Sequence, residues 1–249
     1  MAQVKYYPKR GAFNILQAGS SVVTYDSFMA SLSPQIWYKF DEASGNLVNY
    51  GSYSGAGVVT GSPTYGVAGS PTGADAIRLS PGSPQYFTMA NDASLDVETF
   101  TYVVTLRLMS VTVSLGRIYQ WEAVGGGNQI FINNDRKGIW TVLKSSGAAT
   151  LYPAASNQMG ASLPCDWVTI VYIHNGTTMT GYCFGESITF KTDTATVGAG
   201  TVDAHTGGLI IGNRADEARQ IDAIFGGFAR YDFAWSLEQA QTLEALLYP

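Results

Sequence analysis

The chain has 249 residues, of which 46% are hydrophobic and 13% are charged, a composition that excludes an intrinsically disordered protein. Its length suits a single all-β domain and is sufficient to bury a core without a disulfide or a metal. The formal net charge of −5, with a pI near 4.9, gives a surface that repels nucleic acid and anionic membranes, so we expect neither as a partner.

The start of the chain carries no secretory signal, because Met1–Arg10 lacks an apolar segment. No apolar run approaches the ~20 residues that a membrane-spanning helix needs. We therefore expect synthesis in a cytoplasm and no membrane anchor, unless a signal has been removed from the sequence.

Residues 1–33 are predicted to form an arm that lies outside the main domain. They contain Lys5, Lys9 and Arg10 against a single acidic residue, Asp26, so they carry +2 and the remaining residues carry −7. Their apolar side chains are too few for a core and too many for a free linker, so we expect the arm to lie on its own domain or on a neighbouring subunit. The residues expected to dock it are Lys5, Tyr6, Tyr7, Lys9, Arg10 and Phe13.

A β-prone run stands at Ser21–Tyr25, and the domain is predicted to begin at about Ser33. A first strand at residues 36–40 is followed at 51–75 by a Gly-rich stretch, which indicates a long loop. Further strands are expected at 76–79, 86–89, 100–108, 117–121, 129–133 and 138–143. The mixed polarity of the strand at 100–108 suits a sheet packed on one face.

Two apolar runs flank His174-Asn175-Gly176-Thr177. Asn-Gly between such runs predicts a β-hairpin with a two-residue type I′ turn. With His174 opposite Thr177, Cys183 faces Val168, and Cys165 lies three positions further along, roughly 10 Å away. This separation exceeds the reach of a disulfide, so we predict two free thiols, which fits a reducing compartment.

The C-terminal part is predicted to add strands at 187–191, 208–212 and 223–231. The one convincing helix is Ser236–Leu247, where Ser236 is the expected N-cap and Gln239 completes a capping-box pattern. Its expected apolar stripe consists of Leu237, Ala240, Leu243, Leu246 and Leu247.

Two distant parts of the chain carry a family resemblance. The first is IWYKFDEASG at 36–45, and the second is GLIIGN at 208–213, followed by FGGFARYD at 225–232 and WSLEQ at 235–239. Together they resemble the concanavalin A-like (laminin G-like) jelly-roll family. The resemblance implies an all-β jelly-roll β-sandwich over residues 34–249, with one short C-terminal helix and the N-terminal arm at 1–33. This fold hosts lectins, adhesins, glycosidases and structural modules, so it does not fix the function.

Catalytic patterns are incomplete in this chain. Retaining glycosidases need two carboxyl groups about 5–5.5 Å apart, which related glucanases place on one strand as Glu-x-Asp-x-(x)-Glu. The nearest pattern here is Asp96-Val97-Glu98, and Ser94 stands where the nucleophile is expected. The two histidines, His174 and His205, have no Gly-x-Ser-x-Gly elbow to accompany them. We therefore predict no catalytic residues and rank a glycoside hydrolase last.

Metal ligands are also sparse. The resemblance implies calcium, which takes 6–8 oxygen ligands, but this chain has Ala229 where many relatives have an aspartate after the Phe-x-Gly motif. Asp41, Asp222 and Asp232 remain as candidate ligands. Cysteines at 165 and 183 lack the close spacing of zinc ligands. We expect no cofactor and no metal, with calcium kept as an alternative.

A glycan site is the binding function that the sequence favours. Lectins of this fold use loop asparagines, aspartates and a flat aromatic ring against the sugar. The candidate ligand-binding residues, expected near the Gly125–Gly127 loop and the turn after it, are Trp121, Asn128, Asn133, Asn134 and Trp140. The alternative is that both tryptophans pack between the sheets.

We hypothesise a non-enzymatic virion structural protein of a tailed bacteriophage, either a capsid decoration protein or a tail or fibre component. The absence of both a signal peptide and disulfides argues against a secreted relative. We expect it on the virion surface after synthesis in the host cytoplasm, as a homo-oligomer docked by its arm to other virion proteins, with host surface glycans as a further partner. The alternative is a free-standing carbohydrate-binding module or lectin.

Overall fold

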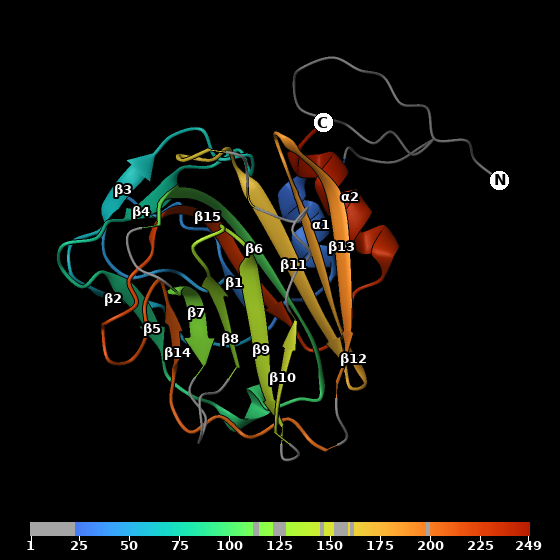
Figure 1. Cartoon of the computed structure of the whole chain (residues 1–249). Coiled ribbons are helices and arrows are strands. Elements are labelled where there is room, and N and C mark those ends of the chain that lie inside the picture. Colours follow the sequence, from blue (N-terminus) through green and yellow to red (C-terminus); the bar gives the residue numbers. More distant parts are fainter. Residues whose placement is uncertain are drawn as a thin grey trace.

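The computed structural model describes residues 23–111, 115–121, 128–144, 147–151, 159, 162–197 and 200–249. These residues form two antiparallel sheets that face each other (Figure 1). The fold is therefore an all-β sandwich with a C-terminal helix, as the sequence predicted. Among the described residues, no helix is both long and apolar enough to cross a membrane.

The larger sheet has eight strands. Its path runs through β13 (Ile188–Thr196), β12 (Thr178–Gly185), β11 (Val168–Asn175), β6 (Thr99–Ser110), β15 (Asp222–Tyr231), β4 (Ala76–Leu79) and β3 (Thr64–Val67), with β1 (Ile36–Tyr38) paired to β15. The smaller sheet has seven strands. Its path runs through β10 (Gly147–Leu151), β9 (Gly138–Lys144), β8 (Asn128–Ile132), β7 (Gly116–Trp121), β14 (Leu209–Ile211), β5 (Tyr86–Met89) and β2 (Val58–Thr60).

The main core lies between the sheets, where alternate residues of the strands face inward. The second core lies on the outer face of the larger sheet, beneath α1 (Tyr25–Ser31) and α2 (Leu237–Leu247). These helices pack against each other over that face (Figure 1). Because both of its faces are covered, β15 is buried along its whole length: Phe228 points into the first core and Ala229 into the second.

Helix α2 confirms the predicted capping box. Ser236 accepts the backbone N–H of Gln239 at 3.2 Å, and the Gln239 side chain accepts the backbone N–H of Ser236 at 2.7 Å. The predicted apolar stripe is correct in part, because Leu243 and Leu247 are buried whereas the side chain of Leu237 is exposed.

Helix α1 begins at Tyr25, the last residue of the β-prone run predicted at Ser21–Tyr25; Val23 stands in a β-bridge, and residues 21 and 22 lie outside the described residues. Thr24 caps the helix, and Ser27 completes a second capping box, which the sequence analysis missed. Tyr25 and Met29 are buried in the core beneath the helices. The described part of residues 1–33 is therefore packed against the domain. All six predicted docking residues, from Lys5 to Phe13, lie outside the described residues.

The β11–β12 hairpin forms, but its turn differs from the predicted type I′ turn. His174 pairs with Met179, two positions beyond the expected partner, and Cys183 consequently faces Ile170. The turn residues are Gly176 and Thr177, and only Gly176 has a positive φ, as in a type II′ turn. The Asn175 side chain fixes this register by accepting the backbone N–H groups of residues 177 and 178. Both cysteines are free, which confirms the predicted thiols.

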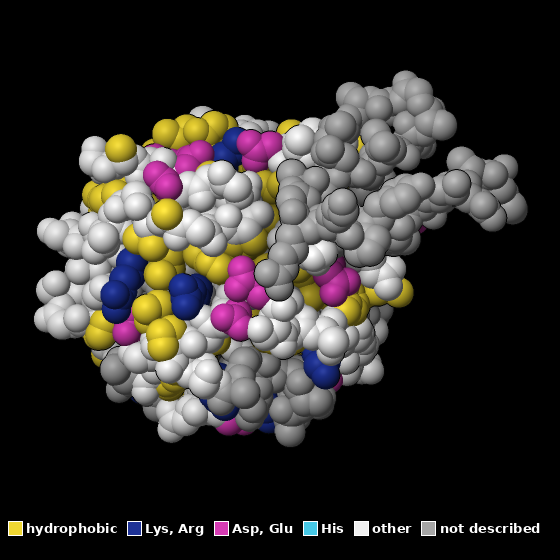
Figure 2. Space-filling view, turned by 90° about the horizontal axis from the view of Figure 1, so that it is seen from above, with side chains coloured by type: hydrophobic (Ala, Val, Ile, Leu, Met, Phe, Trp, Pro, Cys, Tyr) yellow, Lys and Arg dark blue, Asp and Glu magenta, His cyan; other side chains and the backbone are white. Residues whose placement is uncertain are grey.

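The sequence also missed three strands. β2 and β3 lie within the Gly-rich stretch that was interpreted as a loop, and β10 was not predicted. All three are edge strands, and β2 and β3 carry exposed and half-buried residues in place of the long apolar run of a central strand. Seen from above, the surface mixes hydrophobic, basic and acidic side chains (Figure 2).

Candidate functional site

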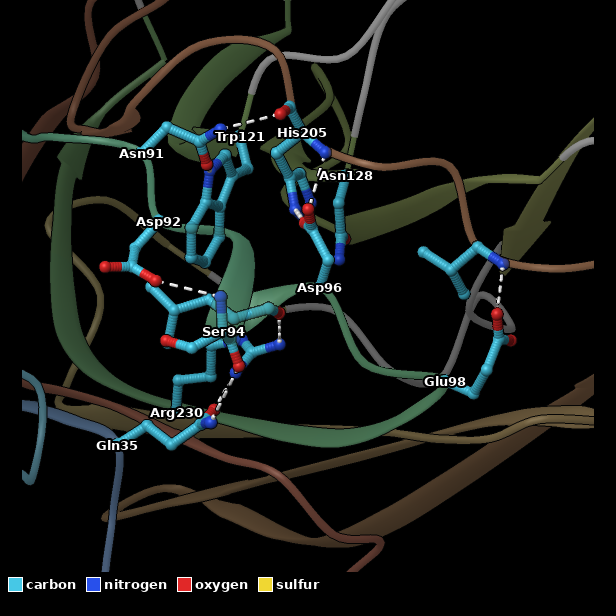
Figure 3. Close-up of polar contacts among 12 residues, drawn as sticks. Gln35, Asn91, Asp92, Ser94, Asp96, Glu98, Trp121, Asn128, His205 and Arg230 are labelled. Carbon is cyan, nitrogen blue, oxygen red and sulfur yellow. Dashed lines mark hydrogen bonds and ion pairs between the residues drawn. The ribbon is translucent and has the colours of Figure 1, made fainter.

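A network of buried and half-buried polar side chains lies at the end of the sandwich where β7 ends and β8 begins (Figure 3). We call it the Trp121 end. Residues 91–98, which follow β5, meet residues 200–208, which precede β14. The short helix η1 (Ala93–Leu95) begins after Asp92, whose carboxylate accepts the backbone N–H of Ser94 at 2.8 Å.

Asp96 and His205 join the two segments. One carboxylate oxygen of Asp96 accepts the backbone N–H of His205 at 3.1 Å and also contacts its ring Nδ1. Asn91 donates to the His205 carbonyl at 2.6 Å and accepts the indole N–H of Trp121 at 3.2 Å. The imidazole and indole rings stack with their centroids 4.3 Å apart. These contacts hold two loops and the end of β7 as one unit.

Arg230 lies within the same network and is only 1% exposed. Its guanidinium group donates to the side-chain carbonyl of Gln35 and to the backbone carbonyl of Leu95 (Figure 3). No ion pair within the described residues includes it. Three aromatic rings lie within cation–π distance, those of Trp121, Phe100 and Tyr102, at 5.4, 5.5 and 5.8 Å. Carbonyl dipoles and ring faces therefore stabilise this buried charge.

The environment of His205 favours the neutral imidazole. Burial lowers the pKa of His205 below its ordinary 6.5 and outweighs the hydrogen bond to Asp96, which raises it. The positive charge of Arg230 lowers it further. The second ring nitrogen, Nε2, is buried and has no hydrogen-bond partner among the described residues.

This shift predicts a pH-dependent stability. As the pH falls from about 7 to about 5, the unfolded chain binds a proton at His205 before the folded chain does, so the free energy of unfolding decreases. NMR titration of the imidazole signals measures the midpoint directly, and we expect it below 6.5. The chain has two histidines, so a His205→Asn variant assigns the signal. A midpoint above 6.5 would show that attraction to Asp96 dominates over burial.

The two carboxylates that a glycosidase reading would use are both bound within the fold. Asp96 is held by His205, whereas Glu98 accepts the backbone N–H of Val202 at 2.7 Å. Figure 3 shows Glu98 directed away from the Asp96–His205 pair. Neither carboxylate is therefore placed as the partner of the other.

Three of the five predicted ligand-binding residues come together, but in the core. The side-chain oxygen of Asn128 accepts the indole N–H of Trp140 at 2.9 Å, and Asn128 pairs with Trp121 across β7 and β8. Both tryptophans are fully buried. Their position agrees with the alternative interpretation, in which both tryptophans pack between the sheets. Neither ring is exposed to a sugar in this structure.

The other two predicted residues lie at the opposite end of β8. Asn133 and Asn134 stand in the turn between β8 and β9, five residues beyond Asn128 and roughly 17 Å along the strand. Asn133 shapes that turn by accepting the backbone N–H of Lys137 at 2.9 Å, and Asn134 is exposed. The five residues therefore do not form one site. The Gly125–Gly127 loop lies outside the described residues.

The candidate calcium ligands are also separated. Asp222 begins β15 and Asp232 follows its end, so the length of the strand, roughly 30 Å, lies between them. Asp222 is bound by Arg78 at 3.2 Å and by Ser110 at 2.6 Å. Within the described residues, no group of three or more His, Cys, Asp or Glu side chains is arranged to hold a metal ion.

Sequence reasoning did not identify the residues that organise the Trp121 end. His205 and Asp96 were noted only as parts of incomplete catalytic patterns. The signal that could have identified Arg230 is its place directly after Ala229, in a strand expected to be buried, because a buried arginine requires unusual surroundings.

A comparison with protein-family models gives no match, and a comparison with curated proteins gives none either. Among solved structures, the chain is similar in fold to binding domains of botulinum neurotoxins and of a mosquitocidal protein. A botulinum neurotoxin type C structure, whose description links cell entry to two ganglioside molecules, has a TM-score of 0.66 at 15% identity, covering 88% of this chain and 53% of that one.

Two further structures give similar values. The serotype D binding domain in complex with N-acetylneuraminic acid has a TM-score of 0.65 at 14% identity, covering 87% of this chain and 52% of its own. The binding domain of Paraclostridial Mosquitocidal Protein 1 has a TM-score of 0.64 at 15% identity, covering 86% and 52%. The chain thus spans about half the length of these structures. At such identities the similarity shows the fold alone.

Proposed function

We propose that this chain is a non-enzymatic, lectin-like recognition module that binds a glycan at its Trp121 end. The observation that carries the proposal is the network there, which fixes two loops. Three polar residues on these loops, Asn91, Ser94 and Thr206, are exposed. Amide and hydroxyl groups match the hydrogen-bonding needs of sugar hydroxyls. A preorganised surface lowers the entropy lost on binding.

The structural neighbours support binding rather than catalysis. Several are described as binding domains, and two descriptions are of complexes, one with SialylT and one with N-acetylneuraminic acid. The engagement of Asp96 and Glu98 by backbone groups argues in the same direction, because a glycosidase needs its two carboxyl groups to face the substrate together.

A glycan array with the full chain tests the proposal. We expect binding that Ser94→Arg or Thr206→Arg weakens at least tenfold, because a long charged side chain would block the surface between the two loops. Thr189→Arg is the matched control, since it makes the same exposed change on β13 at the far end of the sandwich. The proposal fails if no glycan binds, or if all three variants behave alike.

The finer form of the proposal places the module on a virion, docked by its N-terminal arm to a capsid or tail scaffold. The support is the charge distribution: residues 1–22 contain Lys5, Lys9 and Arg10 and no acidic residue, within a chain of net charge −5. Light scattering of the full chain and of a chain lacking residues 1–22 tests the arm. This truncation keeps α1, which packs against α2. An oligomer that becomes a folded monomer supports docking, whereas equal masses remove that role.

A further inference from the structure

The opposite end of the sandwich contains a cluster of arginines outside the site just described. The loop between β14 and β15 is organised by Asn213, which is fully buried. The Asn213 side-chain oxygen accepts the backbone N–H groups of Arg214 at 2.8 Å and of Arg219 at 3.1 Å. The backbone N–H of Arg117, near the start of β7, donates to the Arg219 carbonyl at 2.9 Å. Arg117 is thereby brought beside the loop that carries Arg214 and Arg219.

Arg117 is the most buried of the three, at 6% exposure. Its guanidinium group lies 4.7 Å from the ring centroid of Phe131 and donates from one terminal nitrogen to the Leu115 carbonyl at 2.7 Å. Its Nε is buried without a hydrogen-bond partner among the described residues. No ion pair within that part of the chain includes Arg117. A buried cation in this state is costly unless an anion compensates it.

The surroundings of Arg117 are positively charged. Burial, followed by the charges of Arg214 and Arg219, lowers the pKa of Arg117 to about 10, and Asp216 acts in the opposite direction. Asp216 is already bound to Arg214, by Nε at 2.7 Å and by a second nitrogen. The neighbouring acidic residue, Glu217, accepts the hydroxyl of Tyr86 at 2.8 Å. Three arginines therefore stand against two carboxylates at this end of an acidic chain, and Arg117 is the one of the three whose charge lies closest to full burial.

We propose that Arg117, Arg214 and Arg219 form a binding site for a small oxyanion: a carboxylate, sulfate or phosphate group. Guanidinium forks match the geometry of such groups and bind them with charge-assisted hydrogen bonds. Arg214, which is 32% exposed, is the accessible donor, and Arg117 is the buried cation that raises the local potential. The anion compensates the buried charge of Arg117, which no ion pair within the described residues includes. This site is distinct from the Trp121 end and does not depend on glycan binding there.

The test is an NMR titration of the full chain, following the arginine Nε–H signals with sodium sulfate, sodium phosphate or sodium glucuronate at constant ionic strength. We expect saturable shifts of the Arg117 signal. Arg214→Gln should weaken binding about tenfold, because it removes a charge-assisted donor. Asp216→Asn should tighten binding about threefold or more, because it frees Arg214 from its internal carboxylate.

Lys191→Gln on β13 is the matched control, because it also removes one positive charge but at the edge of the other sheet. Its affinity should stay within about twofold of the native chain. Binding of glucuronate as well as sulfate supports a site open to acidic sugars, and binding of the inorganic ions alone supports a site limited to small anions. Unsaturable shifts, or equal affinities for the Arg214→Gln, Asp216→Asn and Lys191→Gln variants, would overturn the proposal.

Discussion

Replacing Trp140 with alanine is expected to lower the free energy of unfolding by about 3–5 kcal/mol, as for other fully buried tryptophans. Its ring stacks on Tyr172 with centroids 5.1 Å apart, contacts Phe100 edge-on at 6.1 Å and donates its N–H to Asn128 at 2.9 Å. The alanine leaves a cavity between the sheets and removes one of the two hydrogen bonds that the Asn128 side-chain oxygen accepts. Chemical denaturation of the full chain measures the change.

Trp140→Phe separates packing from hydrogen bonding at this position. It keeps an aromatic ring but removes the N–H donor, so we expect a loss of about 1–2 kcal/mol, smaller than that of the alanine variant. The contradicting result would be a Trp140→Ala variant that unfolds at the same denaturant concentration as the native chain but no longer binds glycan. The ring would then contact the ligand and would not be part of the core.

Asn128→Ala is expected to lower the free energy of unfolding by about 2–5 kcal/mol, since each buried donor left unsatisfied costs about 1–3 kcal/mol. Asn128 is 2% exposed. Its side-chain oxygen accepts the Tyr119 hydroxyl and the Trp140 N–H, both at 2.9 Å, and its amide donates to the Tyr102 hydroxyl at 3.4 Å. Alanine has neither the oxygen nor the amide, so all three bonds are lost together.

Asn134→Ala is the matched control for Asn128→Ala, because it makes the same chemical change at an exposed turn position. We expect its free energy of unfolding to stay within about 0.5 kcal/mol of the native value. Denaturation curves of the two variants, measured under the same conditions, show whether the loss of stability is specific to Asn128. Similar effects at both positions would contradict a structural role for Asn128.

The Trp121 end shows why the candidate site was only partly predictable. Trp121 and Asn128 lie on adjacent strands joined by a short connection, so sequence proximity placed them together correctly. Their predicted role in ligand binding stays a prediction, and the structure shows both side chains buried. A tryptophan that alternates with its neighbours along a strand can face either the core or the solvent. Which face is covered depends on the opposite sheet, which has no signature within the hairpin itself.

The cluster of Arg117, Arg214 and Arg219 could not be predicted from the sequence either. Arg117 and Arg219 are about a hundred residues apart in the chain and meet because β14 lies beside β7 in the smaller sheet. The sequence showed Asn213 as part of a strand motif. Only its burial in the folded chain reveals that it shapes the loop that carries two of the arginines.

By itself, the sequence determined the elements whose signals are local. The capping box of Ser236 and Gln239, the β11–β12 hairpin and most central strands follow from hydrogen bonds and periodicities within a few residues. Only the tertiary structure decided the contacts between Asp96 and His205, 109 residues apart, and between Gln35 and Arg230, 195 residues apart. Such contacts depend on strand order and on which faces the sheets cover, and these emerge when the whole core packs.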